Sequence, residues 1–426
     1  MEQYGKILTI AMPIFFALAI LEALYGRVRG QQTTRNMDMI ASMSSGLTMV
    51  VKDVLHISIT LLSYGWLLRN LAMYQIQGSI LTFVVTFIVL DFQGYWTHRW
   101  AHKINFFWNK HAIHHSSEDF NLACALRQSV SSFVNVFTFF LIPAAILGVP
   151  EKVIQTITPI HLFAQFWYHT RHINKMGFLE NILVTPSHHR VHHAMNAEYR
   201  DKNFSQIFII WDKFFGTYQV ELTEVPPVYG ITRPALTWNP LKINFQHMIL
   251  MITDAWRTEN WKDKLTIWFQ PTGWRPADVI VKYPILKVEN TAEYQQYDTQ
   301  NSKAEIVFAW FQILILFILI FYFFGNLGRI GFPSIFYYGI YAFMCIYAYT
   351  ETMDKNRNSI YYELIKNAYG LGIIYFTNDW FGMNQVFGYA SVLLSIYFVF
   401  STLVTAYFAI YTFDKKADFD KVLVQN

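Results

Sequence analysis

Long apolar segments constrain this chain more than any other feature of its sequence. A helix needs about 20 mostly apolar residues to cross a bilayer. The segments that meet or approach this requirement are residues 7–25, 46–68, 79–96, 133–149, 153–168, 306–324, 331–349, 370–381 and 386–411. They predict an all-α, polytopic integral membrane protein whose polar loops carry the chemistry.

The composition agrees with a membrane protein. Of the 426 residues, 54% are hydrophobic and only 15% are charged, whereas soluble domains carry about 25% charged residues. The net charge of +4 is too small to indicate a nucleic-acid partner. Cys124 and Cys345 lie far apart in the sequence, which argues against a disulfide framework and against a thiolate metal site.

Basic residues predict the orientation. The loop after the first apolar segment carries Arg27, Arg29 and Arg35, which is typical of a cytosolic loop. Counting the segments forward places residues 97–130 on the same side, and a helical hairpin around residues 148–150 returns the chain there. Lys415 and Lys416 end on that side too. We therefore expect the polar loops to face the cytosol, from a bacterial inner membrane or the endoplasmic reticulum.

Four regions are expected along the chain. Residues 1–78 form N-terminal membrane helices, residues 79–220 a histidine-rich catalytic domain, residues 221–303 a cytosolic or interfacial insert, and residues 304–426 C-terminal membrane helices. Within the insert, the mixed composition of residues 245–268 fits an amphipathic helix on the membrane surface. It fits equally well an ordinary helix packed on the catalytic face.

Nine histidines lie at the ends of the apolar segments on the predicted cytosolic side. They are His98 and His102; His111, His114 and His115; His189, His192 and His193; and the isolated His169. Residues at i, i+3 and i+4 share a helix face, so each cluster can aim several imidazoles at one point. Imidazole suits Fe, Zn, Cu and Ni. Eight clustered imidazoles exceed the needs of one ion, which predicts two metals.

The residues around these histidines resemble a known family. DFQGYWTHR at 91–99, HHSSEDFNL at 114–122, ALRQS at 125–129, FWYHT at 166–170, TPSHHRVHH at 185–193 and IWDKFFGT at 210–217 are similar to the membrane di-iron fatty acid hydroxylase and sterol desaturase superfamily. Together with the tract at 261–276, they most resemble its alkylglycerol monooxygenase branch.

The resemblance implies a di-iron, O₂-dependent lipid monooxygenase. It makes the eight clustered histidines iron ligands and gives His169 a supplementary role. The implied reaction hydroxylates the carbon next to the ether oxygen of an alkylglycerol, which releases a fatty aldehyde and a glycerol derivative. The implied partners are a membrane lipid substrate and an external reductant such as tetrahydrobiopterin. One departure stands out, because this branch commonly has an acidic residue where this chain has Lys103.

Three carboxylates are candidate catalytic residues. Asp91, at the end of an apolar segment, is expected to orient a clustered histidine, with an interfacial cap as the alternative. Glu118 and Asp119 follow the second cluster and either orient an imidazole or face solvent. Arg127 either holds a lipid headgroup or pairs with Glu118.

The other histidines are expected to play structural roles. His56 and His161 lie within apolar segments and are expected to be buried. His172 and His188 lie close enough to the clusters to orient the metal ligands through hydrogen bonds.

Two other functions remain open from the sequence. A hydroxylase or desaturase of fatty acids, sterols or carotenoids would use the same histidines, with a ferredoxin or a cytochrome as electron donor. A metal transporter or sensor is the more remote reading, because transporters place their ligands near mid-membrane in discontinuous helices.

Overall fold

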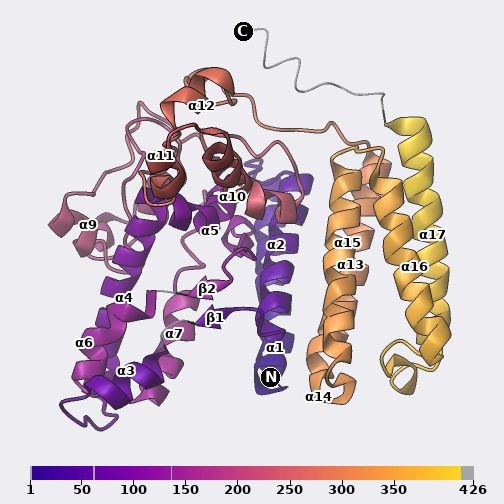
Figure 1. Cartoon of the computed structure of the whole chain (residues 1–426), viewed down its shortest axis with the longest axis horizontal. Coiled ribbons are helices and arrows are strands. Elements are labelled where there is room, and N and C mark those ends of the chain that lie inside the picture. The colour runs from indigo at the N-terminus through magenta and orange to yellow at the C-terminus, as the bar shows by residue number, and fades with distance from the viewer. Residues whose placement is uncertain (1, 61–62, 136, 414–426) are drawn as a thin grey trace.

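The computed structural model describes residues 2–60, 63–135 and 137–413, and their regular secondary structure is almost entirely helical (Figure 1). The helices are α1 Glu2–Val28, α2 Asn36–Val54, α3 Tyr64–Leu71, α4 Ile80–Lys103, α5 Asn105–His115, α6 Ile142–Ile146, α7 Glu151–Phe163, α8 Pro186–His193, α9 Ile210–Phe215, α10 Pro240–Arg257, α11 Trp261–Thr266, α12 Ala277–Lys282, α13 Lys303–Gly325, α14 Leu327–Ile330, α15 Ser334–Met353, α16 Ser359–Thr377 and α17 Ala390–Tyr407. The strands β1 Ile59–Thr60 and β2 Val134–Asn135 form one short parallel pair.

Two groups of helices flank a central pair. One group is α3, α4, α6 and α7, and the other is α13, α15, α16 and α17, with α1 and α2 between them (Figure 1). The central helix α2 is buried along nearly its whole length and packs against both α13 and α15. Its contacts join the N-terminal and C-terminal parts of the chain into one body.

Among the residues that the structure describes, four helices are long and apolar enough to cross a membrane. They are Gly5–Val28, Ile80–Lys103, Lys303–Gly325 and Ala390–Thr412, the last of which continues α17 through a π-helical turn.

The first residues of two of these helices, α4 and α13, form hydrogen-bonded caps. Ser79 with Thr82 and Ser302 with Glu305 form capping boxes that satisfy the first backbone N–H groups of α4 and α13.

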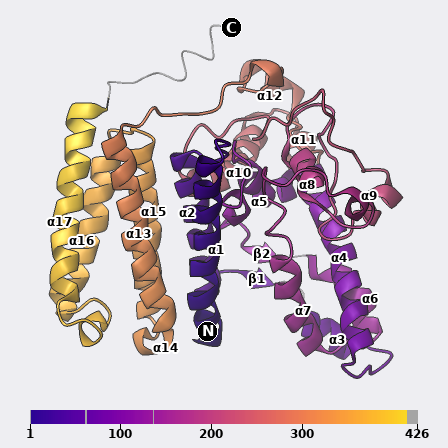
Figure 2. The same ribbon diagram turned by 180° about the vertical axis from the view of Figure 1, so that it is seen from behind.

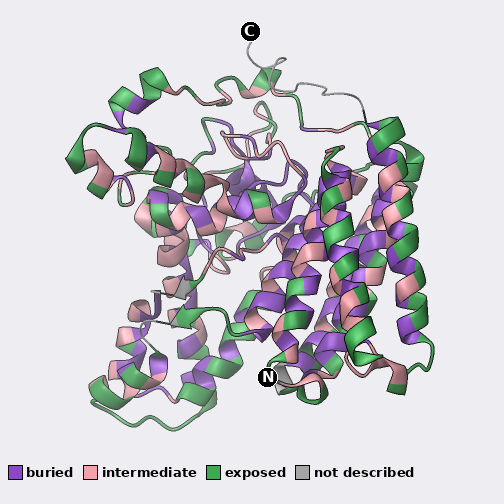
Figure 3. Cartoon of the chain, turned by 45° about the vertical axis from the view of Figure 1, so that its right-hand side comes forward, coloured by how far each residue is buried: buried purple, intermediate pink, exposed green. Residues whose placement is uncertain are grey.

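The distribution of exposed side chains is that of a protein in lipid. Large apolar side chains such as Ile10 on α1 and Leu403 on α17 are 67% and 64% exposed, although they lie in the middle of long helices. Lys366 and Glu363, in contrast, form a 2.6 Å ion pair inside the C-terminal group of helices. Figure 3 shows exposed positions along the outward sides of these helices. Apolar groups outside and charges inside reverse the pattern of a soluble protein.

Three of the predicted spanning segments are not long helices. The segment 46–68 is broken, because α2 ends at Val54 and His56 adopts a positive φ of 51°. The hairpin around residues 148–150 consists of the five-residue α6 and the thirteen-residue α7. At 1.5 Å per residue, α7 is about 20 Å long, which is shorter than the apolar core of a bilayer. The helix expected at 370–381 begins earlier, at Ser359.

Within the insert, α10 packs against α5, the helix that carries the second histidine cluster. Met251 is buried there, and Asp254 accepts from Arg275 at 2.5 Å and 2.9 Å. The outer face of α10 leaves Ile252 and Trp256 exposed. These contacts support the interpretation of a helix packed on the catalytic face. Lys415 and Lys416 lie outside the described residues.

Candidate metal centre

All nine histidines of the sequence pattern come together at one end of the molecule. The last turns of α4, the helices α5 and α8, and the segment after α7 meet there (Figure 2). The histidines form two groups, and within each group every residue offers a ligand nitrogen within 4.8 Å of the others. The five-histidine group is His98, His102, His111, His115 and His192, and the four-histidine group is His114, His169, His189 and His193.

Helical periodicity explains how the histidines divide. The i, i+4 pairs stay together, so that His111 with His115 and His189 with His193 each belong to one group. The remaining histidine of each HxxHH cluster joins the opposite group: His114 leaves the α5 pair, and His192 leaves the α8 pair. The sequence pattern suggested that each cluster converges on one point. The structure instead divides α5 and α8 between two points, and this interleaving places the two groups side by side.

The spacing of the ring nitrogens fits metal coordination. The Nε2 atom of His111 lies 2.9 Å from that of His98 and 3.0 Å from that of His115. In the second group, the Nε2 atom of His189 lies 2.9 Å from that of His169 and 3.0 Å from that of His193. Ligand nitrogens about 2.1 Å from one ion stand about 3.0 Å apart at right angles and about 3.4 Å apart in a tetrahedron. Both groups therefore have the dimensions of a metal site.

Backbone carbonyls fix the direction of four rings. The Nδ1 atom of His98 donates to the carbonyl of Phe204 at 2.7 Å, and that of His192 to Lys202 at 2.9 Å. In the other group, Nδ1 of His114 donates to Arg127 at 3.2 Å and that of His169 to Gln165 at 3.0 Å. A ring that donates through Nδ1 presents an unprotonated Nε2, the form that binds a metal.

Burial keeps the imidazoles neutral. It lowers the pKa of His114 to about 4 and that of His169 well below its usual value, with a further contribution to His169 from the neighbouring His114. Both rings then carry an unprotonated Nε2, and these two atoms lie 3.5 Å apart in a buried site. No proton is available to bridge them, whereas a cation between them would satisfy both lone pairs. This donor set fits a bound metal.

Aromatic side chains surround the two groups. The ring centroid of Phe204 lies 5.2 Å from that of His102, and that of Phe120 lies 5.2 Å from that of His193. Tyr168 lies 4.4 Å from His189 by the same measure. The rings of His115 and His193 stack at 4.3 Å and join the groups. Phe120 and Phe204 are fully buried, so apolar surface covers part of the centre.

Asp91 does not orient a clustered histidine. Its carboxylate accepts from Nε2 of His161 at 2.9 Å, from the backbone N–H groups of Ile207 and Phe208, and from the indole of Trp211 at 2.8 Å. The expected contact is replaced because the loop after residue 204 folds back onto α4. Asp91 thereby fixes the segment that supplies the carbonyl for His98, and it acts on the centre through that backbone.

Glu118 and Asp119 neither contact an imidazole nor face solvent. Asp119 accepts from the backbone and the guanidinium of Arg35 at 2.7 Å and 3.0 Å. Glu118 accepts from the hydroxyl of Tyr294 and from the backbone N–H of Tyr297 at 2.6 Å. Both carboxylates are buried, and burial raises the pKa of Asp119 to about 6. They tie the second histidine cluster to α2 and to the end of the insert.

Arg127 and Lys103 also have protein partners. Arg127 is buried and pairs with Asp38 at 2.8 Å, so neither a lipid headgroup nor Glu118 is its partner. Lys103, where an acid was expected, pairs with Asp201 at 2.7 Å, and both side chains are 40–47% exposed. This ion pair lies at the surface beside the five-histidine group.

The remaining histidines agree with expectation only in part. His161 is buried on Asp91, as predicted, but His56 is exposed at the broken end of α2. The hydrogen-bond partner of the His172 ring is Thr33, and that of the His188 ring is Thr185. The described hydrogen bonds connect neither residue to a clustered histidine. Carbonyls of loop residues take that orienting role, and a carbonyl leaves no signal in a sequence.

Comparison with known proteins identifies the same region. Residues 83–217 match the family model "Fatty acid hydroxylase". Alkylglycerol monooxygenase from Homo sapiens is 38% identical over 279 residues, which cover 65% of this chain and 62% of that protein. Alkylglycerol monooxygenase from Xenopus tropicalis is 36% identical over 289 residues, covering 68% of this chain and 64% of that protein.

A more distant match is the ornithine lipid hydroxylase OlsE of Rhizobium tropici, which is 28% identical over 135 residues, or 32% of this chain and 41% of that protein. The matched part of the chain thus spans less than two thirds of the length of each of these relatives. No solved structure matches the chain. The family resemblance drawn from the histidine motifs is confirmed: residues 83–217 match the fatty acid hydroxylase family, and the chain is similar to alkylglycerol monooxygenases.

Proposed function

We propose that this protein is a membrane di-iron monooxygenase that cleaves the ether bond of an alkylglycerol lipid. The observation that carries the proposal is the interleaved set of nine buried or half-buried histidines, divided five and four. The identity of 36–38% to alkylglycerol monooxygenases supports the choice of substrate. In this proposal the nine histidines hold two iron ions, which supply the site at which O₂ is reduced.

The overall reaction balances as a monooxygenation. One O₂, two electrons and two protons convert the C–H bond next to the ether oxygen into C–OH and release one water. The resulting hemiacetal breaks its C–O bond to give a fatty aldehyde and a glycerol derivative. The two electrons and two protons come from an external donor, for which we propose a tetrahydropterin such as tetrahydrobiopterin.

The protein contributes orientation and exclusion of water to this chemistry. The carbonyls of Phe204, Lys202, Arg127 and Gln165 fix four ligand rings through Nδ1. Phe120 and Phe204 cover part of the centre with apolar surface and keep water from that side. His98 and His102 lie in the last turns of the membrane helix α4, where an alkyl chain in the bilayer can reach the centre with its polar end at the interface.

The basic residues near the histidines support a proposal for which side of the membrane the centre faces. Arg27, Arg29 and Arg35 lie at the histidine end, which supports a centre that faces the cytosol, from the endoplasmic reticulum or a bacterial inner membrane. We assign catalysis to residues 79–220, with the insert at 221–303 packed over them. The helices of 1–78 and 304–426 then form the membrane-embedded frame.

An assay of ether cleavage tests the substrate. The full-length protein in lipid nanodiscs, loaded with iron, is given an alkylglycerol with and without a tetrahydropterin, and the fatty aldehyde is measured by mass spectrometry. We expect aldehyde formation only when the alkylglycerol, O₂ and the donor are all present. Pterin-independent hydroxylation or desaturation of a fatty acid, sterol or carotenoid would refute the proposed reaction and support a fatty acid, sterol or carotenoid hydroxylase or desaturase.

A further inference from the structure

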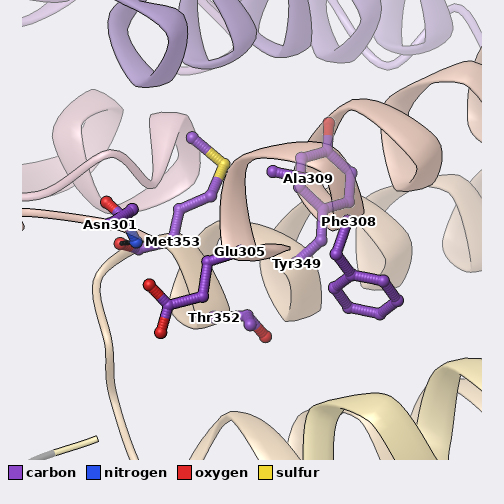
Figure 4. Close-up of a pocket in the computed structure, with 7 residues that line it drawn as sticks. All are labelled: Asn301, Glu305, Phe308, Ala309, Tyr349, Thr352 and Met353. Carbon is purple, nitrogen blue, oxygen red and sulfur yellow. Dashed lines mark hydrogen bonds between the residues drawn. The ribbon is translucent and has the colours of Figure 1, made fainter. Parts of the chain in front are cut away.

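A cavity of about 330 Å³ adjoins the five-histidine group and is not explained by metal binding. His102, His115 and His192 line it together with side chains from α5, α10 and the segments after residues 230 and 267. We call it the donor cavity. A second pocket, between α13 and α15, lies away from the histidines and encloses no volume that a water molecule could enter (Figure 4).

Two tryptophans line the donor cavity. Trp108 comes from α5, and its ring centroid lies 5.2 Å from that of His102 and 5.7 Å from that of His115. Trp274 comes from the segment that follows α11. Indole rings can stack on flat heterocycles, because offset stacking adds to the burial of apolar area.

The polar side chains of the cavity leave hydrogen-bond donors unused. Asp254 is fully paired with Arg275, and Asp201 is paired with Lys103. Arg233 is half-buried and donates to the backbone carbonyl of Gln246 at 3.3 Å, and among the described residues it has no carboxylate partner. The buried hydroxyl of Thr272 also has no hydrogen-bond partner among those residues. A ligand with carbonyl oxygens would satisfy both groups.

The rim of the cavity is charged and open to water. Arg200 and Lys287 line it and are exposed, and the Lys103–Asp201 ion pair stands at the same edge. Moving an alkyl chain from the bilayer past this charged, hydrated rim costs free energy. A water-soluble molecule can reach the rim directly from solvent. The volume lies near the lower end of small-molecule pockets, which span about 300–1,000 Å³. A protein electron donor could not enter.

We infer that the donor cavity binds the small electron donor of the reaction, a reduced nitrogen heterocycle with one flat ring that carries a carbonyl group. The inference rests on the proposed function, because it presumes a reaction that consumes two electrons and two protons. The heterocycle stacks on an indole and accepts a hydrogen bond from Arg233, in contact with histidines of the five-histidine group. It leaves oxidised by two electrons, and those electrons with its two protons reduce one oxygen atom of O₂ to water.

Binding without turnover tests the inference. The metal-loaded, full-length protein in nanodiscs is titrated anaerobically with 6-methyltetrahydropterin in the absence of any lipid substrate, and the heat of binding is measured. Loss of a charge-assisted hydrogen bond predicts that Arg233→Ala weakens binding by about tenfold or more, and Thr272→Val by a smaller factor. Arg257→Ala is the matched control, because Arg257 lies on the same helix over the ring of Tyr283 and outside the cavity.

Thr272→Val also keeps the test decisive if Arg233→Ala fails to fold, because it exchanges one small side chain for another. In turnover, the KM for the donor should rise in both cavity variants while the KM for the lipid stays constant. Unchanged donor binding in both, or a rise only in the KM for the lipid, would overturn the inference. Donor binding that responds to the variants in a protein without ether cleavage would refute the proposed substrate and leave the inference standing.

Discussion

The division of the nine histidines is decided by individual residues. His114 and His192 cross from the cluster that contains them to the opposite group, while the i, i+4 pairs around them stay together. Spacing alone could predict two metals, because eight imidazoles exceed the needs of one ion. It could not predict which histidine joins which group, because that assignment depends on how α5 and α8 face each other. The sequence also could not show which backbone carbonyls accept from the histidine rings, since every residue has a carbonyl.

Replacement of either crossing histidine tests the two-group arrangement. We expect His114→Ala and His192→Ala each to lose activity by more than about 100-fold, since even partners of ligands contribute 10- to 100-fold. Each variant should lose most of one metal per chain and still insert into the membrane. Elemental analysis and the ether-cleavage assay provide the readout. His172→Ala, a histidine outside both groups, is the control and should keep both metals, and full activity in a crossing variant would refute the ligand assignment.

The buried imidazoles make the metal-free protein sensitive to acid. The pKa of His114 is about 4 in the folded protein, against a usual value of 6.5. Between these values the unfolded chain binds the proton and the folded chain does not, so stability falls as pH falls from about 6.5 to about 4. His114 alone would account for about 3 kcal/mol over this window.

Thermal unfolding of the protein after chelation, recorded across this pH range, measures the effect. The melting temperature of the metal-free protein should decline towards pH 4, and that of the metal-loaded protein should decline less. A metal-free protein whose melting temperature does not change between pH 6.5 and pH 4 would contradict this account.

Among the elements, the long helices were predictable and the short ones were not. The apolar segments at 7–25, 79–96, 306–324, 331–349 and 386–411 became α1, α4, α13, α15 and α17. Length and hydropathy suffice there, because the surrounding lipid imposes a helix. Residues 133–168 are apolar as well, yet they form a 3₁₀ turn and two short helices that pack on α3 and α4. Hydropathy does not distinguish burial in protein from burial in lipid.

The loop between α8 and α9 depends on one carboxylate of α4. Asp91 accepts four hydrogen bonds, and three of them come from the stretch that follows Phe204. In Asp91→Asn one acceptor becomes a donor that faces other donors. We expect a loss of about 1–3 kcal/mol in the free energy of unfolding and faster release of metal under chelation. Unchanged thermal stability and metal retention would show that the loop is held by other contacts.

At the scale of the whole molecule, the centre and the C-terminal helices are separate parts of one fold. The helices α13, α15, α16 and α17 carry no histidine of either group, and they pack on the rest through α1, α2 and α10. Their interior holds the buried Glu363–Lys366 pair. The order of the apolar segments predicted this membrane-embedded part, but it did not show that the i, i+3 pair Glu363–Lys366 of α16 would be buried.

Breaking the buried pair separates stability from metal binding. Glu363→Gln leaves Lys366 without its carboxylate and should destabilise the protein by about 3–5 kcal/mol. The metal content of the folded fraction should stay unchanged. The double variant Glu363→Gln/Lys366→Met removes both charges and should recover most of the stability in thermal unfolding. Loss of metal from the folded single variant would instead indicate that the C-terminal helices support the centre directly.

The most direct test of the account is the number of metal ions per chain. The protein is expressed in iron-supplied cells, purified in nanodiscs without added metal, and analysed by inductively coupled plasma mass spectrometry against its amino-acid concentration. The five-histidine and four-histidine groups predict two iron ions per chain, and about one in His114→Ala or His192→Ala. One metal or none in the wild-type protein, or a loss of both metals together in each variant, would contradict two separate groups.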